Sequence, residues 1–136
     1  MISITEGNLI LGSRLGNRSP EPVTTWYVGL STSSINEDGT GITEPSGSNG
    51  YKRVAIQNNS TQFTMPSNLT VKNANPIIFD EVTADCGKAT DIFLSSSQEG
   101  GTAAYYGKFA IPRPLPAQSN LTIAAGDASF KIVNVR

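Results

Sequence analysis

The stretch TWYVGLSTSSINEDGTGITEPSGSNGYKRVAI, residues 25–56, decides the fold that we expect for this chain. It begins with an alternation in which Trp26, Val28 and Leu30 share one face, the pattern of a half-buried strand. It ends with a second strand-like run at residues 51–56. Because the residues between the two runs are rich in glycine, serine, threonine and acidic side chains, they predict a long loop that is either functional or mobile.

The rest of the chain repeats short strand-like runs separated by turn residues. We expect strands at residues 62–65, 68–72, 77–79, 90–94, 103–111, 120–123 and 129–135. Because proline fixes φ and lacks an N–H donor, residues 112–116 are predicted to form a stiff link. Many short strands with little helix predict an all-β fold, specifically an antiparallel β-sandwich of the jelly-roll-like kind.

The apolar residues of these strands make up the core that we predict. The expected buried side chains are Trp26, Val28, Leu30, Val54, Ile56, Ile78, Phe79, Ile92, Leu94, Phe109, Ile123, Phe130 and Ile132. The whole chain of 136 residues has the size of one domain. Within it we expect an N-terminal arm and connector at residues 1–22 and the sandwich at residues 23–136.

The arm carries the candidate binding residues of this sequence. It holds an apolar cluster formed by Leu9, Ile10, Leu11 and Leu15. Leu11 and Leu15 are four residues apart and would share one face of a short helix over residues 6–15, so the arm is predicted to be helical or extended. We interpret the cluster either as a surface that docks on a partner or as a cap on one open end of the sandwich.

Composition argues against several classes of function. Charged residues make up 15% of the chain and the net charge is −1, so neither nucleic acid nor a membrane is an expected partner. The chain has no histidine, which is the commonest general base and metal ligand. The single cysteine, Cys86, rules out an internal disulfide and a cysteine-based zinc site within one chain. We therefore expect a protein that is not an enzyme and has no catalytic residues, cofactor or bound metal.

Two weaker alternatives rest on the acidic residues. Asn36, Glu37, Asp38 and Glu44 offer hard oxygen ligands for calcium, but they lack the spacing of an EF-hand loop. The pairs Glu37/Asp38 and Asp80/Glu81, together with Asp85 and Asp91, could serve a glycosidase, but no apolar pocket is evident around them. We interpret these residues as ordinary turn and rim positions.

Targeting signals are not recognisable in the sequence. The segment MISITEGNLI lacks the basic region and the long apolar run of a signal peptide, and no run is long enough to span a bilayer. We therefore expect the protein to be made and to fold in a cytosol.

Five segments resemble a family of small bacteriophage virion proteins described as tail-fibre-like or capsid-accessory proteins. They are residues 26–32, 38–54 (DGTGITEPSGSNGYKRV), 76–90 (PIIFDEVTADCGKAT), 104–112 (AYYGKFAIP) and 125–132. The resemblance covers most of the chain and keeps the order of the motifs. One departure is Cys86, which stands where the family pattern would have an aromatic residue. The resemblance implies a β-sandwich component of the virion and brings no catalytic residues with it.

The expected function is therefore a structural role in the phage particle. We favour a capsid decoration (cement) or head-fibre protein, because the chain has no heptads or collagen-like repeats. A tail-fibre or baseplate-associated protein is the alternative. The expected partners are major capsid or tail proteins and further copies of the chain. A carbohydrate-binding module that recognises a host glycan is a second class of function, with aromatic platforms drawn from Trp26, Tyr27, Tyr51, Tyr105 and Tyr106.

Overall fold

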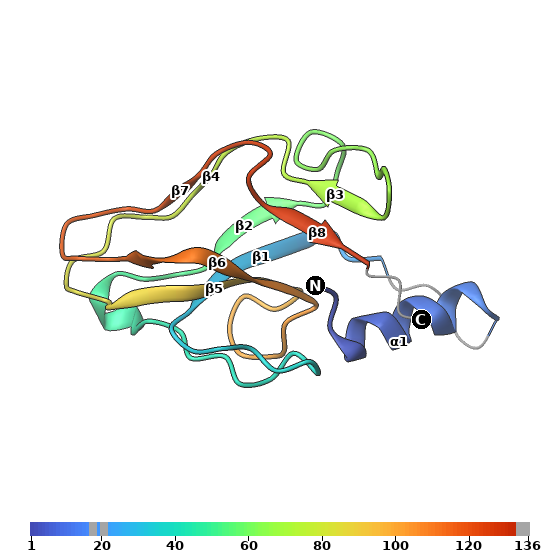
Figure 1. Cartoon of the computed structure of the whole chain (residues 1–136), viewed down its shortest axis with the longest axis horizontal. Coiled ribbons are helices and arrows are strands. Elements are labelled where there is room, and N and C mark those ends of the chain that lie inside the picture. Colours follow the sequence, from blue (N-terminus) through green and yellow to red (C-terminus); the bar gives the residue numbers. More distant parts are fainter. Residues whose placement is uncertain (17–18, 20–21, 133–136) are drawn as a thin grey trace.

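The computed structural model describes residues 1–16, 19 and 22–132 of the chain. Its helices are α1 (Ile4–Arg14) and the short 3-10 helix η1 (Gly47–Asn49). Its strands are β1 (Thr25–Ser31), β2 (Val54–Gln57), β3 (Thr70–Lys72), β4 (Ile77–Ile78), β5 (Lys88–Ser95), β6 (Tyr105–Pro114), β7 (Thr122–Ile123) and β8 (Ser129–Lys131). The predicted all-β fold with a short N-terminal helix is confirmed (Figure 1).

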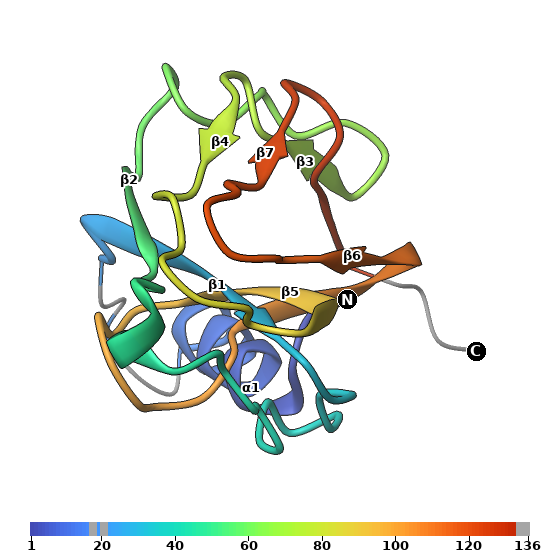
Figure 2. The same cartoon turned by 90° about the vertical axis from the view of Figure 1, so that its left-hand side faces the viewer.

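The strands form two layers. A four-stranded antiparallel sheet in the order β2-β1-β5-β6 is the larger layer. Two separate antiparallel pairs, β3–β8 and β4–β7, form the smaller layer. Figure 2 shows these pairs above the main sheet, and α1 and the long loops below it. The second layer of the sandwich thus consists of two strand pairs instead of one continuous sheet.

The main core fills the space between the two layers. Seven predicted core residues are buried there: Trp26, Val28, Leu30, Ile56, Phe79, Leu94 and Ile123. Four more pack against them while partly exposed: Val54, Ile92, Phe109 and Phe130. The prediction is wrong for Ile78 and Ile132, which are exposed. Because neighbouring strand residues face opposite sides, Ile77 takes the inward position and Ile78 points out. Ile132 follows the last residue of β8.

The other face of the main sheet is covered by loops. Gly29 of β1 lies opposite Phe93 of β5, and Phe93 is fully buried in a second cluster with Ile35 and Ala103. The last half of β1 is therefore buried on both faces, although the alternation of its sequence predicted burial on one face only.

Two local predictions differ from the structure. Residues 62–65 form no strand, and only an isolated bridge joins Phe63 to Asn73. The predicted proline link is instead part of β6, which continues through Pro112 to Pro114 and pairs with Lys88 of β5. Proline is tolerated there because β6 is an edge strand, and no described strand pairs with its outer side at Pro112 or Pro114.

Candidate interaction surface

The N-terminal arm is attached to the free edge of β6. Ile2 bridges Tyr105, the Ser3 amide donates to the Ala104 carbonyl oxygen at 2.8 Å, and the Tyr106 amide donates to the Met1 carbonyl oxygen at 2.8 Å. Ser3 is buried and begins α1 as its N-cap, where its hydroxyl accepts from the Glu6 amide at 3.2 Å. The first three residues thus extend the sheet and fix the starting point of the helix.

Three of the apolar side chains of α1 and its C-cap are exposed to solvent. Ile4, Leu11 and Leu15 are 54%, 58% and 77% exposed. Because they are spaced by seven and four residues, they lie on one face, which we call the α1 stripe. The opposite side carries Glu6 and Ser13, which line a cavity of about 540 Å³ between the helix and the start of β1. Leu9 and Ile10 line the same cavity, so α1 exposes an apolar face in addition to its inner one, whereas an ordinary surface helix has a single apolar face that is buried.

The predicted binding cluster is divided between the two sides of α1. Leu11 and Leu15 belong to the stripe, as their shared face predicted, whereas Leu9 and Ile10 line the cavity beside β1. Sequence reasoning missed Ile4, because the predicted helix began at residue 6. The signal was present in Ser3-Ile4-Thr5-Glu6, since serine followed three residues later by glutamate marks a helix start.

Glu6 shows that this orientation is electrostatically unfavourable. Burial raises the pKa of the Glu6 carboxyl above its usual value. The pKa of Tyr105 is also raised, first by burial and then by the charge of Glu6. Burial of this carboxylate is therefore a cost of the observed placement, in which Leu9 and Ile10 turn toward β1 and Leu11 toward solvent.

The long loops are bound to their own domain by Arg53. Its guanidinium pairs with Glu44 through Nε–Oε1 at 2.8 Å and Nη2–Oε2 at 2.9 Å, and donates to the carbonyl oxygens of Ser97 and Gly100. The Tyr51 hydroxyl donates to the same carboxylate at 2.7 Å. Arg53 is itself buried, and its charge is compensated by the Glu44 carboxylate.

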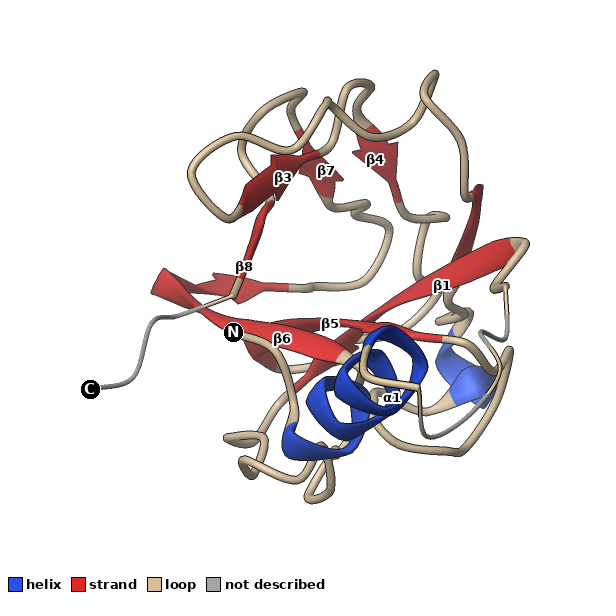
Figure 3. Cartoon of the chain, turned by 90° about the vertical axis from the view of Figure 1, so that its right-hand side faces the viewer, coloured by secondary structure: helices blue, strands red, loops and turns tan. Residues whose placement is uncertain are grey.

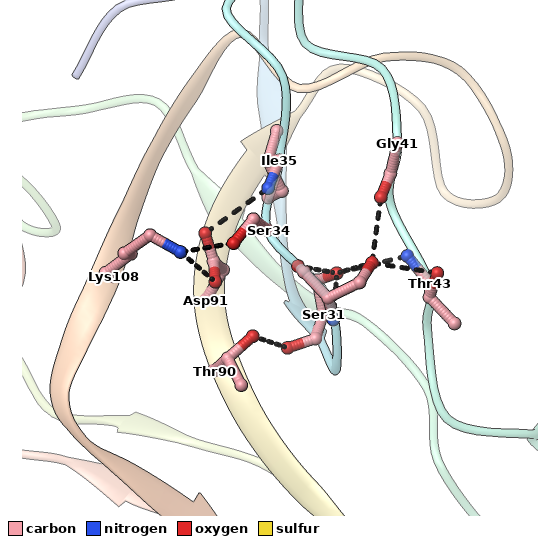
Figure 4. Close-up of polar contacts among 9 residues, drawn as sticks. Ser31, Ser34, Ile35, Gly41, Thr43, Thr90, Asp91 and Lys108 are labelled. Atoms are coloured by element: carbon pink, nitrogen blue, oxygen red, sulfur yellow. Dashed lines mark hydrogen bonds and ion pairs between the residues drawn. The ribbon is translucent and has the colours of Figure 1, made fainter.

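A second polar group holds the beginning of the long loop (Figure 4). Asp91 of β5 is buried, and its Oδ2 accepts from the Ile35 amide at 3.4 Å. Its Oδ1 has no hydrogen-bond partner among the described residues and lies 3.6 Å from the Lys108 ammonium, which also bonds to Ser34. Ser31 accepts from the Thr43 amide at 3.0 Å. Contacts within the chain therefore offset part of the ordering entropy of this loop.

Several of the residues considered for catalysis or calcium binding have other contacts. The Asp38 carboxylate accepts from Thr40, and the Glu44 carboxylate is paired with Arg53. Among the described residues, no three histidine, cysteine, aspartate or glutamate side chains gather as metal ligands would. Cys86 is partly buried and burial raises its thiol pKa, so this thiol resists ionisation.

Two of the five aromatic residues considered for glycan binding are unsuited to it. Trp26 and Tyr51 are both buried, and the Tyr51 hydroxyl accepts from the Leu30 amide at 2.9 Å. Tyr27, Tyr105 and Tyr106 remain partly exposed.

No helix in the described part of the chain is long and apolar enough to cross a membrane.

Comparison with known proteins identifies the family. No curated protein matches the sequence. Residues 1–131 match the family described as podophage GP4 fiber I protein gp80. Because the match covers nearly the whole chain, the protein belongs to the podophage GP4 fiber I protein gp80 family and is a structural protein of the bacteriophage virion.

Proposed function

We propose that this protein is a non-enzymatic subunit of a virion fibre and that the α1 stripe joins it to a neighbouring virion protein. The family description favours a fibre over the capsid decoration that we expected from the sequence. The observation that carries the proposal is the outward direction of Ile4, Leu11 and Leu15 on a helix whose start is fixed by the sheet. Monomeric proteins seldom expose such a contiguous apolar surface unless it binds something.

The arm is suited to attachment because its two parts have separate tasks. Residues 1–3 are held by backbone hydrogen bonds to β6 and to the loop before it. The helix then presents its apolar side chains at a defined position, so little conformational entropy is lost when a partner binds. The stripe carries no charged side chain, and an uncharged, apolar partner surface is therefore the best match.

Labelled particles test the location. We expect mass spectrometry of purified virions to detect the chain and gold-labelled antibody to mark the fibres in electron micrographs. Label spread over the whole head would instead support capsid decoration. Absence of the chain from purified virions would refute the structural role.

Substitution of the stripe tests the mode of attachment. The double variant Leu11→Ser/Leu15→Ser should fold as the wild type does, because both side chains are exposed, but it should be lost from particles. Ile111→Ser is the matched control, because Ile111 is 76% exposed on β6 and lies outside the arm. Incorporation of the double variant at the wild-type level would show that attachment uses another surface.

A further inference from the structure

An apolar groove opens between the β3–β8 pair and the main sheet. It has a volume of about 870 Å³. Four aromatic rings follow one another along it in edge-to-face contacts: Trp26 with Tyr105, Tyr105 with Phe130, and Phe130 with Phe63, with centroid distances of 6.0–6.1 Å. Its lining also includes exposed Met65, Leu69 and Ile132 and contains no charged residue. We call this feature the aromatic groove.

The aromatic groove and the arm together hold most of the exposed apolar side chains of the protein. Ten large hydrophobic side chains are exposed among the described residues, and eight of them lie on these two features. The arm contributes Met1, Ile4, Leu9, Leu11 and Leu15, and the groove contributes Met65, Leu69 and Ile132. Six of the eight belong to the α1 stripe and the aromatic groove themselves, since Met1 lies at the start of the arm and Leu9 lines the cavity beside β1.

Both features lie at the same end of the molecule. Figures 1 and 3 show α1 and the β3–β8 pair on one side of the domain, with the main sheet between their levels. The pKa of the Met1 amine is consistent with this arrangement. It is lowered first by burial and then by the positive charge of Lys131 in β8. The start of the arm is thus close to the strand that borders the groove.

We propose that the aromatic groove of one copy binds the α1 stripe of a second copy; this names the partner of the stripe and so rests on the proposed function. The anchors of an amphipathic helix that enters a groove recur one or two turns apart on one face, and Ile4, Leu11 and Leu15 are spaced by seven and four residues. The helix has eleven residues and is about 16 Å long, which sets the length of groove that its anchors would occupy.

A second copy of the chain is the occupant that matches the chemistry. Both the stripe and the groove lining are uncharged, so the contact buries no unpaired charge. One helix face alone would bury much less than the roughly 800 Å² per partner of a stable interface. Because both features lie at one end, two copies related by a twofold axis exchange helices, and each then contributes both a helix and a groove to one closed interface.

Sedimentation of the full-length protein over a range of concentrations tests the proposal. The variants are Leu11→Glu in the stripe, Met65→Glu in the groove and Ile111→Glu as a control on β6, all at exposed positions. We expect the wild type and the control to associate. Each of the other two should raise the dissociation constant at least about tenfold, with an unchanged circular dichroism spectrum.

A mixture of the two weakened variants distinguishes groove binding from other contacts. The Met65→Glu chain keeps an intact helix and the Leu11→Glu chain keeps an intact groove, so the mixture should form heterodimers more readily than either variant associates alone. If the Met65→Glu variant associated as strongly as the wild type while the Leu11→Glu variant did not associate, the helices of two copies would be pairing with each other. That result would overturn the proposal. A monomeric wild type that is nevertheless found in virions would also overturn it while leaving the proposed function intact. An associating chain that is absent from virions would refute the proposed function alone.

Discussion

Arg53 and Glu44 form a two-pronged ion pair that closes the long loop onto the sheet. The two N–O distances are 2.8 and 2.9 Å, and only 3% of the Arg53 side chain is exposed. The same guanidinium lies 5.0 Å from the centre of the Phe93 ring and binds two carbonyl oxygens of the loop after β5. One side chain thus connects both long loops with the second hydrophobic cluster.

Replacing Arg53 by lysine should destabilise the protein strongly. Lysine keeps the positive charge but cannot make the parallel bonds to Glu44 and also reach Ser97 and Gly100. We expect a loss of about 3 kcal/mol in the free energy of unfolding, measured by urea denaturation, because the largely buried Glu44 carboxylate and the two carbonyl oxygens lose hydrogen bonds that only the guanidinium can make together.

The exposed pair Lys52–Asp80 is the matched control. Its ions are 2.9 Å apart, but the side chains are 73% and 59% exposed. Lys52→Ala should cost less than about 1 kcal/mol. Equal losses for Arg53→Lys and Lys52→Ala would show that burial adds nothing to the Arg53 contact.

Gly29→Ala should also be destabilising. A Cβ atom at position 29 would lie 2.2 Å from Phe93 Cζ, so the buried ring would have to move. Overpacking of this kind typically costs about 1–3 kcal/mol in unfolding experiments. Gly107→Ala, in β6 with no heavy atom within 4 Å of the new Cβ, should stay within about 0.5 kcal/mol of the wild type. A second substitution, Phe93→Leu, should recover part of the Gly29→Ala loss, and failure to do so would place the strain elsewhere.

Local sequence patterns predicted those parts of the fold that depend on local geometry. The alternation of Trp26, Val28 and Leu30 identified the inward face of β1, and the four-residue spacing of Leu11 and Leu15 identified their common helix face. The same rule failed for Ile78. Residues 77–79 are all apolar, so the sequence does not indicate which of them faces the core in this two-residue strand.

Contacts between distant parts of the chain could not be predicted in this way. Arg53 is buried because Glu44, Ser97 and Gly100 meet it from two loops, and its sequence neighbours carry no sign of this. The aromatic groove joins Phe63, Tyr105 and Phe130, which lie far apart in the sequence. The outward direction of α1 depends on the attachment of residues 1–3 to β6, and periodicity alone does not indicate which face turns outward.

Ser3→Ala should loosen α1 without unfolding the sandwich. The substitution removes the hydroxyl that accepts from the Glu6 amide, and loss of an N-cap costs about 1 kcal/mol. Amide hydrogen exchange in α1 should then become roughly fivefold faster, while exchange in β1 and β5 stays unchanged. Ser13→Ala is the control, because the Ser13 hydroxyl donates to the Ile10 carbonyl inside the helix and caps no amide. Similar exchange in both variants would mean that the Ser3 hydroxyl contributes nothing to the helix start.

Glu6→Gln should make the folded state more stable at neutral pH. Burial raises the pKa of Glu6 above the value of 4.5 that it would have when exposed, so the folded protein holds this proton more tightly than the unfolded chain. Between the two pKa values the folded state carries more bound protons, and stability therefore falls as the pH rises. The wild type should lose stability as the pH rises from 4.5 through the raised pKa, and the loss should be complete above it.

The glutamine variant cannot ionise and should lack this loss. Urea denaturation at about pH 4 should give nearly equal stabilities for wild type and Glu6→Gln, whereas at about pH 7 the variant should be the more stable. Glu99→Gln, in the exposed loop after β5, should follow the wild type throughout. A Glu6→Gln variant that is less stable than the wild type at neutral pH would contradict the prediction, because attraction between the carboxylate and the N-terminus of α1 would then outweigh its burial.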